Sequence, residues 1–181
     1  MNQEFAALMN RICTELLAGE IYHSRAANEF RKIALRGFGR WAESEARGDM
    51  NSRVCLEKLL RDKLGFAPTV DTSSLSNEAR VAFANISELP SILQKWIDRE
   101  KEFSKILTQA MKMAAEIDVE IYRELIELTN EVQTEVFRVK LCGVRLELAG
   151  WNGHDLGIVS TILHEHFEKH PDDKYVNVNL G

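Results

Sequence analysis

The chain has 181 residues, of which 45% are hydrophobic, and this length suits one domain with a sizeable core. It has no long uncharged apolar run and no basic segment followed by an apolar one near its start, so we expect a cytoplasmic protein without a membrane partner. A net charge of -5 argues against nucleic acid as a partner, and three widely separated cysteines lack the close pairing of a zinc site.

The first two predicted helices cover residues 5 to 34 and the segment from Gly37 to about Lys63, where apolar residues recur three and four positions apart. Between them, Gly37 is expected to adopt the left-handed conformation of a helix end or turn. Because this turn is short, the two helices are predicted to be antiparallel neighbours.

A long connection follows, because residues 64 to 87 are rich in turn-forming and capping residues, with a short helix expected near residues 78 to 85. Ser87 is predicted to cap a third helix, with Pro90 in its first turn and an end near Glu116. Asp118 is then expected to cap a fourth helix that runs to Ala149.

A shorter helix is predicted from residue 154 to residue 170, and the tail from residue 171 to 181 has no helical pattern. The chain is therefore predicted to be all-α. A short turn, a long crossover and another short turn define the ferritin-like four-helix bundle, here with a short fifth helix at the C-terminal end. We expect the bundle to cover residues 1 to 150, and the fifth helix and tail to cover residues 151 to 181.

Each long helix also places a polar group in or beside its apolar stripe: Glu15, Asp49, Glu100 and Gln133. A buried, unpaired carboxylate is unfavourable by several kcal/mol, so buried acids occur with a cation, a metal or a hydrogen-bond donor. If the helices bundle, the four groups can converge on one small cluster that resembles a two-metal site.

The alternative is that Glu15 and Asp49 lie at the margin of their stripes. They would then pair one helical turn away with Arg11 and Arg53 and take part in no chemistry.

The chain resembles the ferritin family over nearly its full length. Glu15-Leu16 with Tyr22 is similar to the first ferritin helix, and Gly37-Phe38-Gly39-Arg40-Trp41 is similar to the start of the second. Glu100 falls at the position of the third-helix ligand, and Glu131-x-Gln133-x-Glu135 resembles the fourth-helix signature. The resemblance implies iron oxidation and storage inside a hollow shell of twenty-four copies, with the fifth helix at its four-fold contacts.

By this resemblance the metal ligands would be Glu15, Asp49, Glu100 and Gln133. Gln133 would also position water or oxygen, and Glu135 would serve as a relay carboxylate. The implied cofactor is non-haem iron, and the implied partners are iron ions and further copies of the chain in a homo-oligomeric cage.

The chain also departs from the family pattern. The second helix has Gly48-Asp49-x-x-Ser52 where the family has Glu-Glu-x-x-His, so the histidine ligand is missing from this position. Asp49 reaches less far than a glutamate, and Val136 occupies the position of a second-site carboxylate. We therefore expect a degraded centre with weak or slow ferroxidase activity.

Further hypotheses concern other ligands and other classes of function. Met50 lies near the position where a bacterioferritin binds haem, but methionine is common on exposed helix faces, so haem is not expected. His164, His166 and His170 form a second group of potential ligands, or are solvated histidines near a helix end. A different class of function is a catalytically silent structural or interaction module. A smaller cage of the DNA-protecting type is disfavoured, because the chain lacks a basic N-terminal extension.

Overall fold

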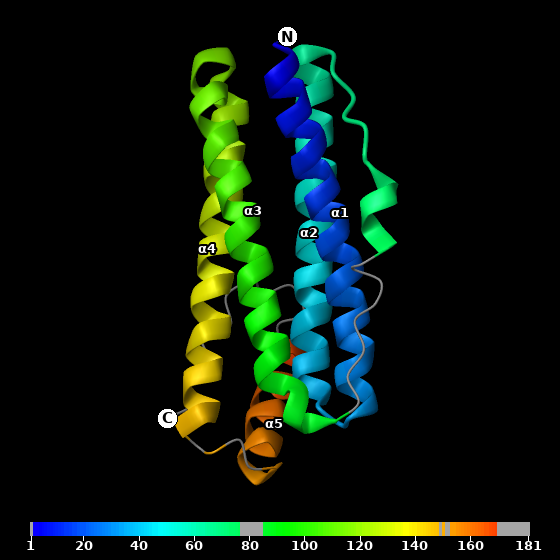
Figure 1. The fold of residues 1–181 in the computed structure, drawn as a ribbon, viewed down its shortest axis with the longest axis vertical. Coiled ribbons are helices and arrows are strands. Elements are labelled where there is room, and N and C mark those ends of the chain that lie inside the picture. The colour runs from blue at the N-terminus through cyan, green and yellow to red at the C-terminus, as the bar shows by residue number, and fades with distance from the viewer. Residues whose placement is uncertain (1, 77–84, 149, 151–152, 170–181) are drawn as a thin grey trace.

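The computed structural model describes residues 2–76, 85–148, 150 and 153–169, and in these ranges it contains helices and no strand, as predicted (Figure 1). The expected helix near residues 78 to 85 lies almost entirely outside the described residues, as do His170 and the tail. The described elements are α1 (Gln3–Lys32), α2 (Arg36–Leu64), η1 (Thr72–Ser76), η3 (Ile86–Glu88), α3 (Leu89–Ile117), α4 (Val119–Leu148) and α5 (Gly153–Lys169).

The four long helices form one bundle in which α1 packs along α2 and α3 packs along α4 (Figure 1). α1 also packs against α3, whereas α2 and α4 meet over a shorter contact. The segment after α2 runs back along the outside of α1, where the main-chain N–H of Thr69 donates to the Asn10 side chain at 2.8 Å. The predicted long crossover is therefore confirmed.

The structure confirms one of the two predicted helix caps. The Asp118 carboxylate accepts hydrogen bonds from the main-chain N–H groups of Glu120 at 2.8 Å and Ile121 at 3.0 Å, which confirms the predicted cap of α4. The predicted Ser87 cap of α3 is wrong: its hydroxyl bonds to the Asn85 side chain instead, and α3 begins two residues later, at Leu89. Pro90 lies in the first turn of α3, as predicted.

Gly37 was expected to be a turn residue, and this prediction is wrong. The left-handed conformation between α1 and α2 belongs to Ala34, with a φ of 65°, while Gly37 lies in the first turn of α2. A Cβ on Gly37 would lie 1.8 Å from the main-chain oxygen of Ser160 in α5. The Gly37 N–H also donates to the Ser160 hydroxyl at 3.0 Å, so glycine is needed here to let α5 approach α2.

Two apolar clusters fill the bundle, one on each side of a polar layer. The lower cluster, next to α5, contains residues 22 to 30 of α1, 89 to 97 of α3 and 139 to 146 of α4. The upper cluster contains residues 5 to 16 of α1, 103 to 114 of α3 and 121 to 132 of α4. The two cores therefore fix the helix backbones on both sides of the intervening layer. This layer contains His23 of α1, Glu45 and Asp49 of α2, Arg99 and Glu100 of α3, and Glu135 of α4.

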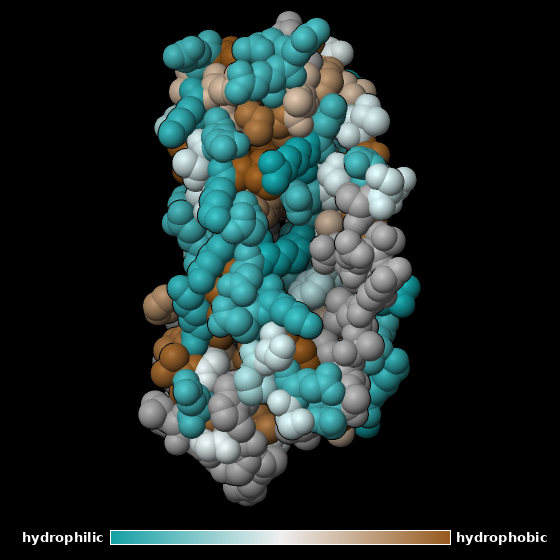
Figure 2. Space-filling view, in the orientation of Figure 1, coloured by the Kyte–Doolittle hydropathy of each residue, from teal (hydrophilic) through white to brown (hydrophobic). Residues whose placement is uncertain are grey.

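The outer surface has a different character. The face seen in Figure 2 is largely hydrophilic, with apolar atoms visible between the polar side chains. Among the described helices, none combines the length and the apolar composition needed to cross a bilayer.

Candidate metal centre

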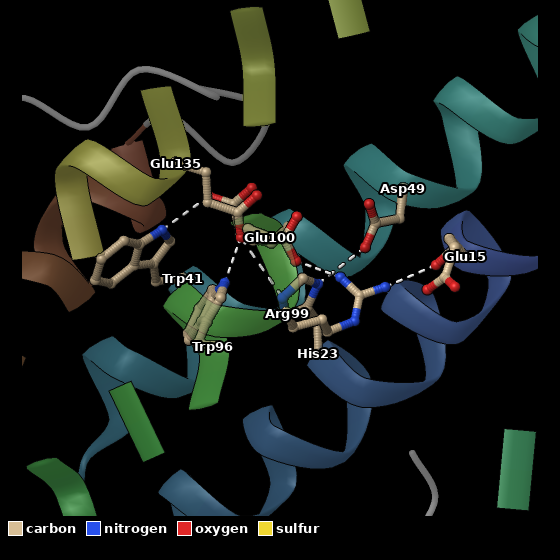
Figure 3. A network of polar contacts seen from close by, with 9 residues as sticks. Glu15, His23, Trp41, Asp49, Trp96, Arg99, Glu100 and Glu135 are labelled. Carbon is tan, nitrogen blue, oxygen red and sulfur yellow. Dashed lines mark hydrogen bonds and ion pairs between the residues drawn. The ribbon is translucent and has the colours of Figure 1, made fainter. Parts of the chain in front are cut away.

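His23 of α1 lies at the centre of the polar layer and has no exposed surface (Figure 3). Its Nδ1 lies 2.9 Å from Asp49 Oδ2, and donation of the Nδ1 hydrogen to this carboxylate leaves the lone pair on Nε2. Nε2 has no hydrogen-bond partner and lies 3.5 Å from Glu135 Oε1. Burial, and then the Arg99 charge, lower the pKa of His23 to about 3, so the imidazole is neutral near pH 7.

Two buried carboxylates face this imidazole, one from α3 and one from α4. Glu100 projects from α3 and is 1% exposed, and Glu135 projects from α4 and is 8% exposed. The potential ligand atoms of His23, Glu100 and Glu135 all lie within 4.8 Å of one another. Ligands about 2.0–2.2 Å from one metal ion lie up to about 4 Å apart, so small side-chain adjustments would let the three groups share an ion.

Two indole N–H groups hold carboxylates of this layer in place (Figure 3). Trp41 Nε1 donates to Glu45 Oε1 at 2.8 Å, and Trp96 Nε1 donates to Glu135 Oε1. The Trp96 ring also packs against the His23 ring, with the ring centres 4.8 Å apart. Hydrogen bonds to the side chains that bind a metal orient those side chains in proteins. Here the two indole N–H groups can make such bonds because both indoles are buried in the apolar stripes.

Arg99 supplies a buried positive charge. Its Nη1 donates to Glu100 Oε1, and its Nη2 donates to the main-chain oxygen of Glu15 at 2.7 Å. The cation offsets only part of the negative charge, because Glu45, Asp49 and Glu135 approach the same layer.

Burial, and after it the neighbouring negative charges, raise the pKa values of these carboxyl groups. Burial raises the pKa of Glu45 to about 7, despite the Trp41 hydrogen bond that lowers it. Burial also raises the pKa of Glu100, opposed by Arg99, and burial and then Glu45 hold the pKa of Glu135 well above its usual range. The metal-free layer therefore retains protons that a divalent cation would displace.

A cavity of about 40 Å³ reaches this layer between α2 and α4, where the two helices meet least. Its volume fits a few water molecules or a small hydrated ion, and it is too small for an organic substrate. The polar residues that line it are Glu45, Asp49, Ser52, Glu131, Thr134, Glu135 and Arg138.

The structure brings only some of the predicted ligands together. Asp49 and Glu100 lie in the cluster, and Glu135, predicted as a relay group, lies there as well. Glu15 is half-buried and meets the network through its main-chain oxygen. The prediction that Gln133 faces the interior is wrong, because its side chain is exposed: the buried stripe of α4 passes through Glu135 instead.

The alternative pairing of Asp49 with Arg53 is not what the structure has. Asp49 contacts His23, whereas Arg53 forms ion pairs with Glu20 at 3.4 Å and Glu57 at 3.0 Å. Ser52, at the position where the resemblance implied a histidine, donates to Glu131 at 3.4 Å. An imidazole is nevertheless present, and it comes from α1.

Sequence reasoning did not single out His23, Glu45 or Arg99 as site residues. His23 had a detectable signal, since it continues the buried spacing Ile12, Leu16, Gly19 by four positions. Glu45 interrupts the apolar face of α2 one turn before Asp49. Arg99 had no comparable signal, because an arginine beside a glutamate on a helix is usually solvated.

No family model matches the chain, and no curated protein matches it. Solved structures do. The open pore ferritin of the archaeon Archaeoglobus fulgidus is similar with a TM-score of 0.77 at 15% identity, over 91% of this chain and 98% of that one. An engineered closed form of the same ferritin gives a TM-score of 0.76 at 15% identity, over 91% of this chain and 96% of that one. A humanized archaeal ferritin gives 0.74 at 16% identity, over 91% and 97%. The chain has the ferritin-like four-helix bundle fold.

The raised carboxyl pKa values predict that the metal-free protein is more stable at about pH 6.5 than at about pH 8. An acid whose pKa is raised on folding contributes stability below its unfolded pKa, and that stability is lost as pH rises through the folded value, about 7 for Glu45. The opposite contribution of His23 is lost mainly as pH falls from 6.5 towards about 3, so it changes by only about 0.4 kcal/mol in this window.

Thermal unfolding in the presence of a chelator measures this effect. We expect the Tm to fall by several degrees from pH 6.5 to pH 8, since a stability change of 1 kcal/mol shifts the Tm of a chain of this size by about 2–4 °C. Glu135→Gln keeps an oxygen that accepts from Trp96 and should flatten the profile. A Tm that rises from pH 6.5 to pH 8 would contradict the predicted excess of buried carboxylates.

Proposed function

We propose that this chain is a ferritin-like iron-binding and iron-storage protein that takes up the ion at His23, Glu100 and Glu135, with slow ferroxidase activity. The observation that carries the proposal is the buried Nε2 of His23, which faces two carboxylates and has no hydrogen-bond partner. A mixed imidazole and carboxylate donor set suits iron and similar divalent metals. The likeness to ferritins supports iron among these metals.

In this proposal each residue of the layer has a distinct part. Asp49 accepts the Nδ1 hydrogen of His23 and so keeps the Nε2 lone pair directed at the ion. Trp96 fixes Glu135, and Trp41 fixes Glu45. Glu45, with a pKa of about 7, can release its proton as a cation arrives through the cavity that it lines. Iron(II) is the substrate, and its oxidation is the reaction that the centre would promote.

Loss of the imidazole should weaken metal binding. We expect His23→Gln to lower the affinity for cobalt(II), used as an oxidation-resistant probe, by at least about 100-fold. Loss of a group that only hydrogen-bonds to a metal ligand already lowers metal affinity by about 10–100-fold. Calorimetry and the visible cobalt spectrum measure the change. Glu102→Gln, an exposed change in α3, is the control and should bind cobalt(II) as the unmodified chain does. Equal affinity in all three proteins would remove His23 from the centre.

Iron oxidation is expected to be slow. Asp49 contacts His23, Ser52 supplies no imidazole, and Gln133 is exposed, so the centre lacks several groups of a full two-metal site. An oxygen electrode should record slow consumption after iron(II) addition. Glu100→Ala should reduce the rate further, whereas Glu102→Ala, an exposed change on the same helix, should not. Rapid stoichiometric oxidation that Glu100→Ala abolishes would overturn the slow-centre proposal.

Self-assembly into a cage is part of the same proposal. Phe137 and Val144 of α4 are 64% and 52% exposed, and Ile158 of α5 is 46% exposed, so apolar side chains on the outside of the bundle are available for contacts between copies. The ferritin-like fold supports a closed assembly.

Size-exclusion chromatography with light scattering, followed by elemental analysis of the same peak, tests this part. We expect a particle of many copies that contains metal. The second candidate function is the catalytically silent module, favoured by the internal Arg99–Glu100 pair that already neutralises one carboxylate. A monomer or dimer without metal would support that module.

A further inference from the structure

Arg99 is held inside the polar layer by contacts from two helices. Its side chain is 11% exposed, although it begins on the margin of α3. Nη1 donates to the Glu100 carboxylate of its own helix, and Nη2 donates to the main-chain oxygen of Glu15 in α1 at 2.7 Å. The guanidinium also lies 5.9 Å from the centre of the Tyr22 ring. These contacts fix the charged end of the side chain in one place.

Gly19 shows how closely the surrounding groups approach this charge. A Cβ on Gly19 would lie 2.3 Å from Asp49 Oδ2 and 2.6 Å from Arg99 Nη2. The carboxylate of α2 and the guanidinium of α3 therefore converge on the same point of α1, where only a glycine leaves room for both. Arg99 thus donates to oxygen atoms of α1 and α3, and Asp49 of α2 lies on the same side of the layer (Figure 3).

The other side of the layer is arranged differently. There the imidazole Nε2 of His23 and the carboxylates of Glu100 and Glu135 lie within 4.8 Å of one another, and Nε2 has no hydrogen-bond partner. Glu100 is shared between the two sides, because its Oε1 accepts from Arg99. In two-metal sites the ions lie about 3.5–4 Å apart and share carboxylate ligands of this kind. A guanidinium cannot lose its proton in a protein, so its charge is permanent.

We propose that the Arg99 guanidinium fills the position of a second metal ion, so that each subunit takes one divalent cation, at His23, Glu100 and Glu135. This inference rests on the proposed function, since it presumes that the centre binds metal. A second ion that shares the Glu100 carboxylate would have to lie beside the Arg99 guanidinium and would be repelled by its charge. Chemistry that needs two ions in one subunit is then absent.

The number of ions per chain tests the inference. Oxygen-free protein is titrated with cobalt(II), desalted, and assayed for bound cobalt per chain, and electron paramagnetic resonance reports whether two bound ions are coupled. We expect one equivalent for the unmodified chain. Arg99→Met, which keeps the length of the side chain and removes the charge, should take up a second equivalent. Arg99→Lys keeps the charge and should stay at one. Lys101→Met, an exposed change on the same helix, is the control and should also stay at one.

Each outcome decides between the proposals. Two equivalents in the unmodified chain would overturn the single-ion inference and leave metal binding intact, whereas no bound cobalt would remove the proposed function itself. A folded Arg99→Met protein that still binds one ion would show that Arg99 does not exclude the second. If Arg99→Met fails to fold, as judged by circular dichroism, the counts for the unmodified chain and Arg99→Lys still decide, because two ions in either protein would overturn the inference.

Discussion

The gathering of four carboxylates in one layer of the bundle, two of them buried and two partly buried, is the constraint on which the rest of the structure depends. Glu45, Asp49, Glu100 and Glu135 enter this layer from three helices, and a buried charge is strongly unfavourable unless it is paired or hydrogen-bonded. The chain meets this constraint with two indole N–H groups, one imidazole and the buried Arg99 cation. Proton retention by the remaining carboxyls, or a bound cation, must supply the rest of the compensation.

Apolar packing offsets the unfavourable free energy of the polar layer, and it fixes the backbones that carry the polar groups. The upper cluster contains Phe5, Met9 and Leu56, and the lower cluster contains Phe30, Phe38 and both buried indoles. Each large side chain buried in this way contributes about 1.5–3 kcal/mol, so the two clusters together can offset an unfavourable layer between them. α5 completes the lower cluster, and its close approach depends on Gly37. The docking of a C-terminal helix and the geometry of the polar layer are therefore linked through one core.

The fold could be predicted from the sequence because its signals are local. Periodic apolar residues, Asp118 as a cap and a long segment of turn residues indicate four helices in the observed order. Glu100 could be placed inside because Trp96 and Phe103 frame it in an unambiguous stripe. The site was harder, because a register error of one or two residues turns a side chain by about 100° or 200° around a helix. Such errors placed Glu15 and Gln133 in the interior, where Leu16 and Glu135 are found.

The position of Arg99 could not be predicted, since it depends on contacts between distant helices and on the missing side chain of Gly19. The spacing of His23 places it in the buried stripe of α1, but its contact with Asp49 depends on how α1 and α2 pack. The second helix has Ser52 where a histidine was implied, and the short Asp49 was expected to weaken ligation. In the folded chain Asp49 instead reaches His23 on the neighbouring helix at 2.9 Å and orients its ring towards Glu135. Asp49 therefore supports His23 by accepting its Nδ1 hydrogen, and the imidazole of the layer comes from α1 and not from α2.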